Sequence, residues 1–321
     1  MLRFTLPSVV MNIFASLYII VDGFFVANFV GTAEFAAVNL IMPAMNIPGT
    51  IGYMFGVGGS ALIARLSGEG DQDKANSLFS LLVLVSSCLG VLMLVPGFIF
   101  MRPLTALLGA QGQLLENSVL YGRIFILALP AWILLYEFQL FFVAAERPEL
   151  GLAVTLCAGF CNIALDALFI IVFKWGLAGA AAASAISQLT GGLFPIIYFG
   201  RKNNSLLRLT KPVWDGIAIL KALGNGSSEF MSEVSYSVVG IIYNLQLLKY
   251  AGENGVAIYG VLMYVSLIFS AIFVGYSNGI GPVFSYHYGA QDHGELKNLR
   301  KRSLVIIGIT SVAMCILSEA L

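Results

Sequence analysis

Five acidic residues lie inside long apolar segments of the sequence, where a negative charge is costly. They are Asp22, Glu137, Asp166, Glu229 and Glu233. An ionisable group inside a membrane-spanning helix costs at least ~2.5 kcal/mol on insertion scales, so such groups usually face a cavity and mark a transport pathway. None of the five has a Lys or Arg at a similar depth, so each must be protonated, hydrated or bound to a cation. We interpret them as candidates for cation binding.

Three segments carry pairs of polar residues four positions apart, namely Tyr18 with Asp22, Asn162 with Asp166, and Ser184 with Gln188. Residues four apart in a helix project from the same face. The pairs therefore supply oxygen-bearing side chains that can converge on one cation. The alternative is that these groups only join helices by hydrogen bonds, each worth about 0.6 kcal/mol. A carboxylate is a costly residue for that purpose.

A further polar stripe follows steps of three and four residues along a later segment. It contains Glu229, Glu233, Tyr236, Ser237, Gly240 and Asn244. This spacing predicts one polar helix face lining a cavity, with Glu233, Tyr236 and Asn244 facing a substrate. Glu229 is close enough to the end of its segment that simple hydration is an equal alternative. We also assign Tyr18, Gln188 and Glu137 to the cavity wall, and the role of Glu137 stays open.

The composition requires a lipid environment for the elements that position these residues. The sequence is 59% hydrophobic and 11% charged, against about 25% charged residues in soluble domains. A helix crosses the hydrocarbon layer with about 20 apolar residues. Nine segments meet this requirement, at 5–28, 35–64, 76–101, 121–145, 150–173, 176–199, 217–249, 255–286 and 303–321. The ninth is still apolar at Leu321, so we expect a fragment of a larger architecture.

Basic residues are distributed unevenly between the two sets of loops. Most of the 17 Lys and Arg residues lie at the N-terminus and after the second, fourth, sixth and eighth segments. Because basic loops stay on the cytoplasmic side, we expect a multi-pass inner-membrane protein with a cytoplasmic N-terminus. Arg102, Arg123, Lys174 and Lys249 fall on the opposite side.

The sequence also matches itself at an offset of 221 residues. The offset pairs Gly31 with Gly252, Gly58 with Gly279, Gly68 with Gly289, and Asp71 with Asp292. This pattern predicts a repeat in which the first three segments correspond to the seventh to ninth, with the same orientation in the membrane. A complete second half would need three more helices. Chance matching of common residues is the alternative.

Several other classes of function are disfavoured. Zero net charge argues against nucleic acid as a partner. The cysteines lie in apolar segments and suit packing better than metal binding, and both histidines are expected in a loop. No G-x-x-x-x-G-K-[ST], H-E-x-x-H or G-x-S-x-G motif is present. We therefore expect no enzyme activity and no cofactor, with an ion gradient as the energy source.

Four stretches carry a resemblance to a known family. They are LYIIVDGFFVANFVGTAEFAAVNLIMP (17–43), GVGGSALIARLSGEGDQDKA (56–75), CNIALDALFIIVFKWGLAGAAAASAISQ (161–188), and AIYGVL through GPVFSYHYGAQ (257–291). In combination they resemble multidrug and toxic compound extrusion (MATE) transporters of the prokaryotic type. The resemblance covers essentially the whole chain.

The resemblance implies an all-α polytopic membrane protein with two pseudo-symmetric six-helix lobes, of which about nine of twelve helices are present. Residues 1–200 would form the N-terminal lobe, and 201–321 part of the second lobe. A cation site in the first lobe of prokaryotic members matches Asp22, Asn162, Asp166 and Ser184, with Ser in place of the commoner Thr. A carboxylate on the seventh helix, used in some branches, is matched loosely by Glu233.

The expected function is secondary active efflux, in which H⁺ or Na⁺ enters and amphipathic, often cationic drugs or metabolites leave. We expect a monomer whose other partner is membrane lipid. One alternative is a lipid-linked precursor flippase of the related superfamily, although its cavity needs basic side chains. An intramembrane aspartyl protease is another alternative, although Asp22 and Asp166 lack its flanking motifs.

Overall fold

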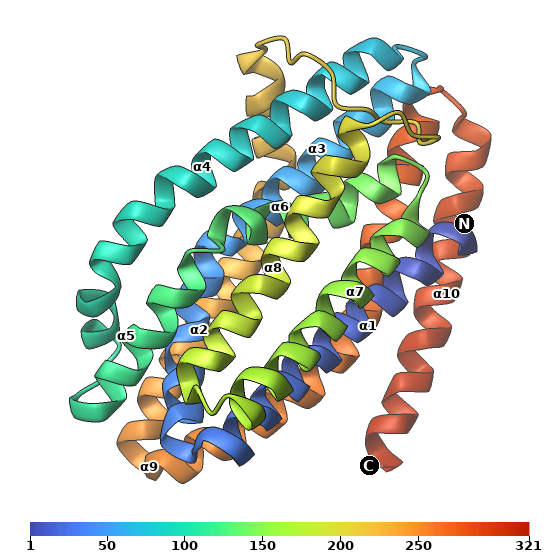
Figure 1. The fold of residues 1–321 in the computed structure, drawn as a ribbon. Helices are drawn as coiled ribbons and strands as arrows, with labels where there is room; N and C mark the ends of the chain where they lie inside the picture. Colours follow the sequence, from blue (N-terminus) through green and yellow to red (C-terminus); the bar gives the residue numbers. More distant parts are fainter. Residues whose placement is uncertain (321) are drawn as a thin grey trace.

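The computed structural model of the chain describes residues 1–320, apart from the side chains of 244, 248, 251–262, 264, 265, 268 and 317–320. Every element assigned in this range is helical (Figure 1). In chain order they are α1 (Leu2–Phe25), η1 (Val26–Val30), α2 (Thr32–Gly49), α3 (Ile51–Gly68), α4 (Gln72–Leu107), α5 (Gly112–Ile126), α6 (Leu129–Ala144), α7 (Pro148–Asp166), η2 (Ala167–Val172), α8 (Gly176–Gly200), α9 (Gly216–Gly289) and α10 (His293–Ala320). The elements η1 and η2 are short π-helices.

The helices have the length and apolarity of membrane spans. Among the described residues, five helical stretches qualify, and a sixth is added if the bent pair α5–α6 is one span. The chain bends by 61° between the two helices of that pair. Pro130, near the start of α6, has no backbone N–H to continue the hydrogen bonding of α5, so the bend has a local cause.

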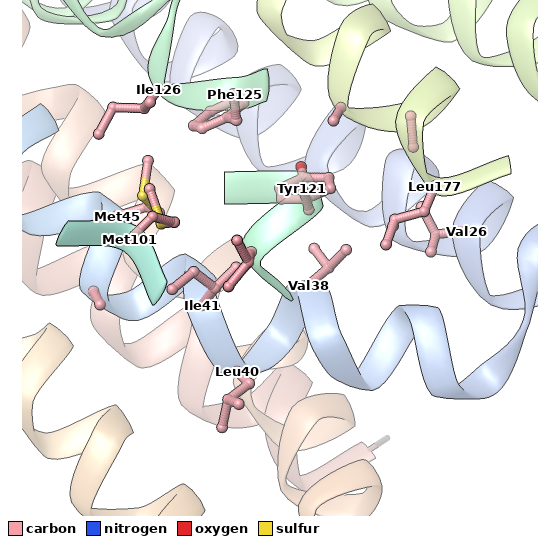
Figure 2. Close-up of a cluster of buried hydrophobic side chains, with 14 of the residues drawn as sticks. Val26, Val38, Leu40, Ile41, Met45, Met101, Tyr121, Phe125, Ile126 and Leu177 are labelled. Atoms are coloured by element: carbon pink, nitrogen blue, oxygen red, sulfur yellow. The ribbon is translucent and has the colours of Figure 1, made fainter. Parts of the chain in front are cut away.

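Apolar side chains fill the interior and also cover parts of the outer surface. Figure 2 shows one buried cluster, in which Ile41 and Met45 of α2 pack near Met101 of α4 and Phe125 of α5. On the outward side of α4, by contrast, Leu92 is 70% exposed. Exposed leucines of this kind suit a helix that faces lipid rather than water.

Helix α9 is 74 residues long and folds back on itself. A Cβ atom added at Gly58 of α3 would collide with the carbonyl of Ala222, and one added at Gly68 would collide with that of Tyr286. A straight helix would separate Ala222 from Tyr286 by roughly 96 Å, whereas both touch α3. The two predicted segments 217–249 and 255–286 are therefore two antiparallel arms of α9, as Figure 1 shows.

One close helix crossing follows the offset of the predicted repeat. Gly68 lies against the backbone at Tyr286, and Gly289 lies against the backbone at Arg65. These contacts exchange under a shift of 221 residues, which pairs Arg65 with Tyr286 and Gly68 with Gly289. Glycine is required at both positions, because a side chain would meet main-chain atoms that cannot move aside.

Some predicted boundaries are wrong in a consistent direction. Helix α4 extends beyond 76–101, and α10 begins at His293 rather than at 303. His287 lies in the last turn of α9, so neither histidine is in a loop as predicted. Hydropathy detects only the part of a helix within hydrocarbon, whereas the backbone hydrogen bonding continues into the polar interface.

Arg123 is a further correction. It was predicted in a loop, but it lies inside α5, with its guanidinium 5.2 Å from the centre of the Phe98 ring. Its segment 121–145 consists of the end of α5 and all of α6, and the bend between them divides the predicted span.

Candidate cation-binding site

Residues from α1, α7 and α8 meet in a polar cluster, which we call the cation cluster: Asp22, Asn162, Asp166, Ser184 and Gln188. The Ser184 hydroxyl donates to Asp22 Oδ1 at 3.3 Å. The Asn162 amide donates to Ser184 Oγ at 3.4 Å. Asp166 lies beside Asp22. The structure thus brings together the four residues that the sequence assigned to a cation site.

The cation cluster is buried and has an excess of acceptor oxygens. Asp166 is 0% exposed and Asn162 is 1% exposed. Both carboxylate oxygens of Asp166, Asn162 Oδ1 and Gln188 Oε1 have no hydrogen-bond donor among the described residues. Buried polar atoms normally have a partner, because leaving one unpaired costs roughly 1–3 kcal/mol. Oxygens of this kind can bind a proton or act as ligands of a small cation.

Among the described residues, no basic side chain forms an ion pair with Asp22 or Asp166. The ion pairs between described residues are all formed by other side chains. Two carboxylates side by side repel each other when both are ionised, unless a proton or a cation lies between them. The described residues also hold no group of three His, Cys, Asp or Glu suited to a metal ion. A proton or a cation between Asp22 and Asp166 would relieve their repulsion.

Each acid is followed by a π-helical stretch. Asp166 is the last residue of α7, directly before η2, and Asp22 lies shortly before η1. The two π-helices also contact each other. π-Helical turns are rare and occur frequently at functional sites. They were not predicted, because both stretches are apolar apart from Asn28 and give no distinct signal in a hydropathy pattern.

Sequence analysis also missed Tyr121 of α5. Its side chain is 1% exposed, lies beside Ser184 and is close to Asp22 and Asp166. A signal existed, because Asn117 and Tyr121 are four residues apart and mark a polar face of α5. Tyr121 adds a hydroxyl to the edge of the cation cluster.

A group of tyrosines lies next to the cation cluster. Tyr53 of α3 and Tyr136 of α6 stack with ring centres 4.3 Å apart. Tyr18 of α1 is near Tyr53 and also lies beside Gln188. Glu229 and Glu233 of α9 are close enough to Tyr53 to interact electrostatically. These side chains thus connect the cation cluster to the acids of α9.

The remaining predicted cavity residues are more scattered. Glu137 is fully buried beside Ser86 of α4 rather than at a cavity wall. Tyr236 is half-exposed, and its hydroxyl lies 3.2 Å from Met263 Sδ. The side chain of Asn244 lies outside the described residues. Two surface grooves, between α4 and α5 and beside the N-terminal half of α1, contain none of the predicted site residues.

Comparison with known proteins identifies a matching family. The model of the MatE family matches residues 7–168 and 230–321. The multidrug export protein MepA of Staphylococcus aureus (strain MRSA252) is 27% identical over 319 residues, covering 98% of this chain and 70% of MepA. MepA of Staphylococcus haemolyticus is 29% identical over 315 residues, covering 98% of this chain and 68% of the relative.

A solved structure has the same fold. An outward-facing multidrug resistance MATE family transporter of the MOP superfamily superposes with a TM-score of 0.89 at 22% sequence identity. The alignment covers 98% of this chain and 70% of that one.

Proposed function

The chain belongs to the MatE family, and we propose that it is a secondary active multidrug efflux transporter in which the cation cluster couples export to the entry of H⁺ or Na⁺. It is thus a multi-pass membrane transporter rather than an enzyme. The MepA relatives are multidrug export proteins by name, which supports drug-like small molecules as substrates.

One observation carries the proposal: Asp22 and Asp166 lie side by side, and both Asp166 oxygens and the nearby Asn162 Oδ1 are buried without a hydrogen-bond donor among the described residues. A bound cation removes the repulsion between Asp22 and Asp166 and so stabilises the approach of α1 to α7. Without the cation, this approach is unfavourable. The cation thus favours one conformation of the bundle, and a drug that favours another conformation is released in exchange.

The π-helical stretches provide the means for α1 to change shape. A π-turn has one extra residue in its hydrogen-bonded ring, so it can convert to α-helix with a shift of the following residues. Because η1 (Val26–Val30) follows Asp22 closely, binding or release of a cation at Asp22 is transmitted to η1. In this proposal the conversion of η1 couples cation binding to the position of α1.

The tyrosines are the proposed wall of the drug site. Tyr53 and Tyr136 present stacked rings, and Glu229 and Glu233 supply negative charge nearby. Aromatic faces and carboxylates together attract amphipathic organic cations. Tyr18 and Gln188 lie where this wall meets the cation cluster. Residues 1–200 and 201–321 are proposed to belong to two lobes that move relative to each other around this site.

The orientation and assembly are also proposals. We place the protein in the inner membrane as a monomer, with a cytoplasmic N-terminus, because of its basic-residue distribution. Cysteine-accessibility labelling of the 201–215 loop in intact cells tests the orientation. Labelling from outside would contradict it.

Efflux from a drug-sensitive host tests the function. The wild-type protein should lower ethidium accumulation in energised cells, and Asp166→Asn should reduce the efflux rate at least ~10-fold, the effect of about 1.4 kcal/mol of lost coupling. Asp73→Asn, the same change at an exposed acid, is the matched control and should remain active. Collapsing the proton or the sodium gradient separately identifies the ion. Undiminished, gradient-driven efflux by Asp166→Asn would rule out the cation cluster as the coupling site.

A further inference from the structure

Glu137 is a fully buried acid that the proposed transport mechanism does not use. It lies in the middle of α6, is 0% exposed, and has one hydrogen-bond partner among the described residues, Ser86 of α4, which is also 0% exposed. The oxygen Glu137 Oε2 is in short contact with Ser86 Oγ, and Oε1 has no partner.

From this geometry we propose that Glu137 is a permanent proton-binding site, a neutral carboxylic acid that donates a hydrogen bond to Ser86 and thereby joins α6 to α4. The inference does not rest on the proposed transport function, because it concerns a different acid on different helices.

Counting protons supports the neutral form. The Ser86 hydroxyl has one proton but two acceptors within reach, Glu137 Oε2 and the Val83 carbonyl at 3.2 Å. A neutral Glu137 donates a hydrogen bond to the Ser86 hydroxyl, and that hydroxyl donates its own hydrogen bond to the Val83 carbonyl. Both contacts are then made at once. An ionised Glu137 would accept one hydrogen bond, from the Ser86 hydroxyl, and would have no positive charge to balance it. A carboxylate without such a partner is strongly unfavourable in an interior that excludes water.

Among the described residues, no basic side chain forms an ion pair with Glu137. Ser86 is the one described side chain that interacts electrostatically with Glu137. On α3 the neighbour is Gly56, whose missing side chain lets the helix lie directly against the Glu137 backbone. The nearby tyrosines of α3 and α6, Tyr53 and Tyr136, stack on each other instead. On α4, Cys88 is exposed on the outer surface.

The contact has a consequence for the cation cluster. Helix α6 also packs closely on α8, because an added Cβ atom at Gly192 would collide with the Ala131 carbonyl. Helix α8 carries Ser184 and Gln188. By fixing α6 to α4, the Glu137 proton holds the surface on which α8 rests, so Glu137 is a positioning residue and takes no part in the transport cycle.

Infrared spectroscopy of the purified protein reads the protonation state directly. The wild-type spectrum minus that of Glu137→Gln at neutral pH should contain the C=O stretching band of a protonated carboxylic acid. This band should not change when Na⁺ is added or when the pH is varied between 6 and 8. Carboxylate bands in its place would overturn the proposal, whether or not the protein transports drugs.

Three variants test the positioning role. Glu137→Gln is neutral and can still donate to Ser86, so it should melt close to the wild-type temperature and keep the wild-type pH profile of efflux. Glu137→Ala and Ser86→Ala each remove one side of the contact and should melt at least about 3 °C lower. A Glu137→Gln protein that melts normally but has lost proton-driven efflux would show that Glu137 exchanges its proton, and would refute the proposal.

Discussion

At the scale of single residues, spacing was a good guide to which polar groups meet. The four-residue steps of Asn162 with Asp166 and of Ser184 with Gln188 predicted shared helix faces, and the structure brings those faces to Asp22. Spacing did not reveal what lies opposite each face. Glu137 was therefore assigned to a cavity wall, although it lies between packed helices.

Ser184 offers a sharp test of the cation cluster, because its hydroxyl links Asp22 to Asn162. Ser184→Ala removes that link and one hydrogen bond from each of Asp22 and Asn162, at a cost of about 1–3 kcal/mol. We expect the cation concentration that half-activates efflux to rise at least ~5-fold. Ser184→Thr keeps the hydroxyl and should stay within about twofold. An equal effect of both changes would indicate a steric rather than a hydrogen-bonding role.

At the scale of helices, the sequence predicted which segments are apolar but not how their ends are built. Apolar length gave the outer bounds of α8, and of α7 together with η2, almost to the residue. It did not give the π-helices η1 and η2, because Val26–Val30 and Ala167–Val172 have the composition of ordinary spanning helix. These irregular turns depend on tertiary packing, which local sequence does not encode.

The start of α4 allows a test of pH dependence outside the membrane. The Lys74 ammonium, 2.8 Å from the Asp71 carboxylate, and the Lys74 backbone N–H together lower the pKa of Asp71. A lowered pKa in the folded state means that Asp71 stabilises the fold above its unfolded pKa of about 3.9. The contribution is lost as the pH falls through the lower folded value.

We therefore expect Asp71→Ala to melt below the wild type at pH 7, with the difference shrinking below about pH 4. Asp71→Asn keeps a helix-capping side chain but loses the charge, so its melting temperature should lie between those of Asp71→Ala and the wild type. Thermal melts at both pH values provide the measurement. A difference that stays constant with pH would mean that the Asp71 charge is not involved.

At the scale of the whole molecule, the repeat at 221 residues was the most informative pattern in the sequence. It depended on a few glycines, of which Gly58, Gly68 and Gly289 lie at crossings of α3 with α9, whereas Gly279 lies against α1. The offset indicated that the positions correspond, but not which helix each one contacts, because contact between distant segments follows from the packing of the entire bundle.

Two glycines on the same arm of α9 test how these crossings support the bundle. A Cβ atom at Gly226 would collide with the Met54 carbonyl, whereas one at Gly224 has no neighbour within 4 Å. We expect Gly226→Ala to destabilise the protein by about 1–3 kcal/mol. Gly224→Ala should be neutral, or stabilising by up to ~1 kcal/mol. Thermal melts of the two variants check this, and equal melting temperatures would contradict the close crossing.

The crossing at Gly68 and Gly289 limits how a solute can pass between α3 and α9. Main chain meets main chain there, so no rotamer change can create an opening. A solute can pass between α3 and α9 at that end only after entire helices part. The two glycines, which lack side chains, thus let the backbones of α3 and α9 close against each other at this point.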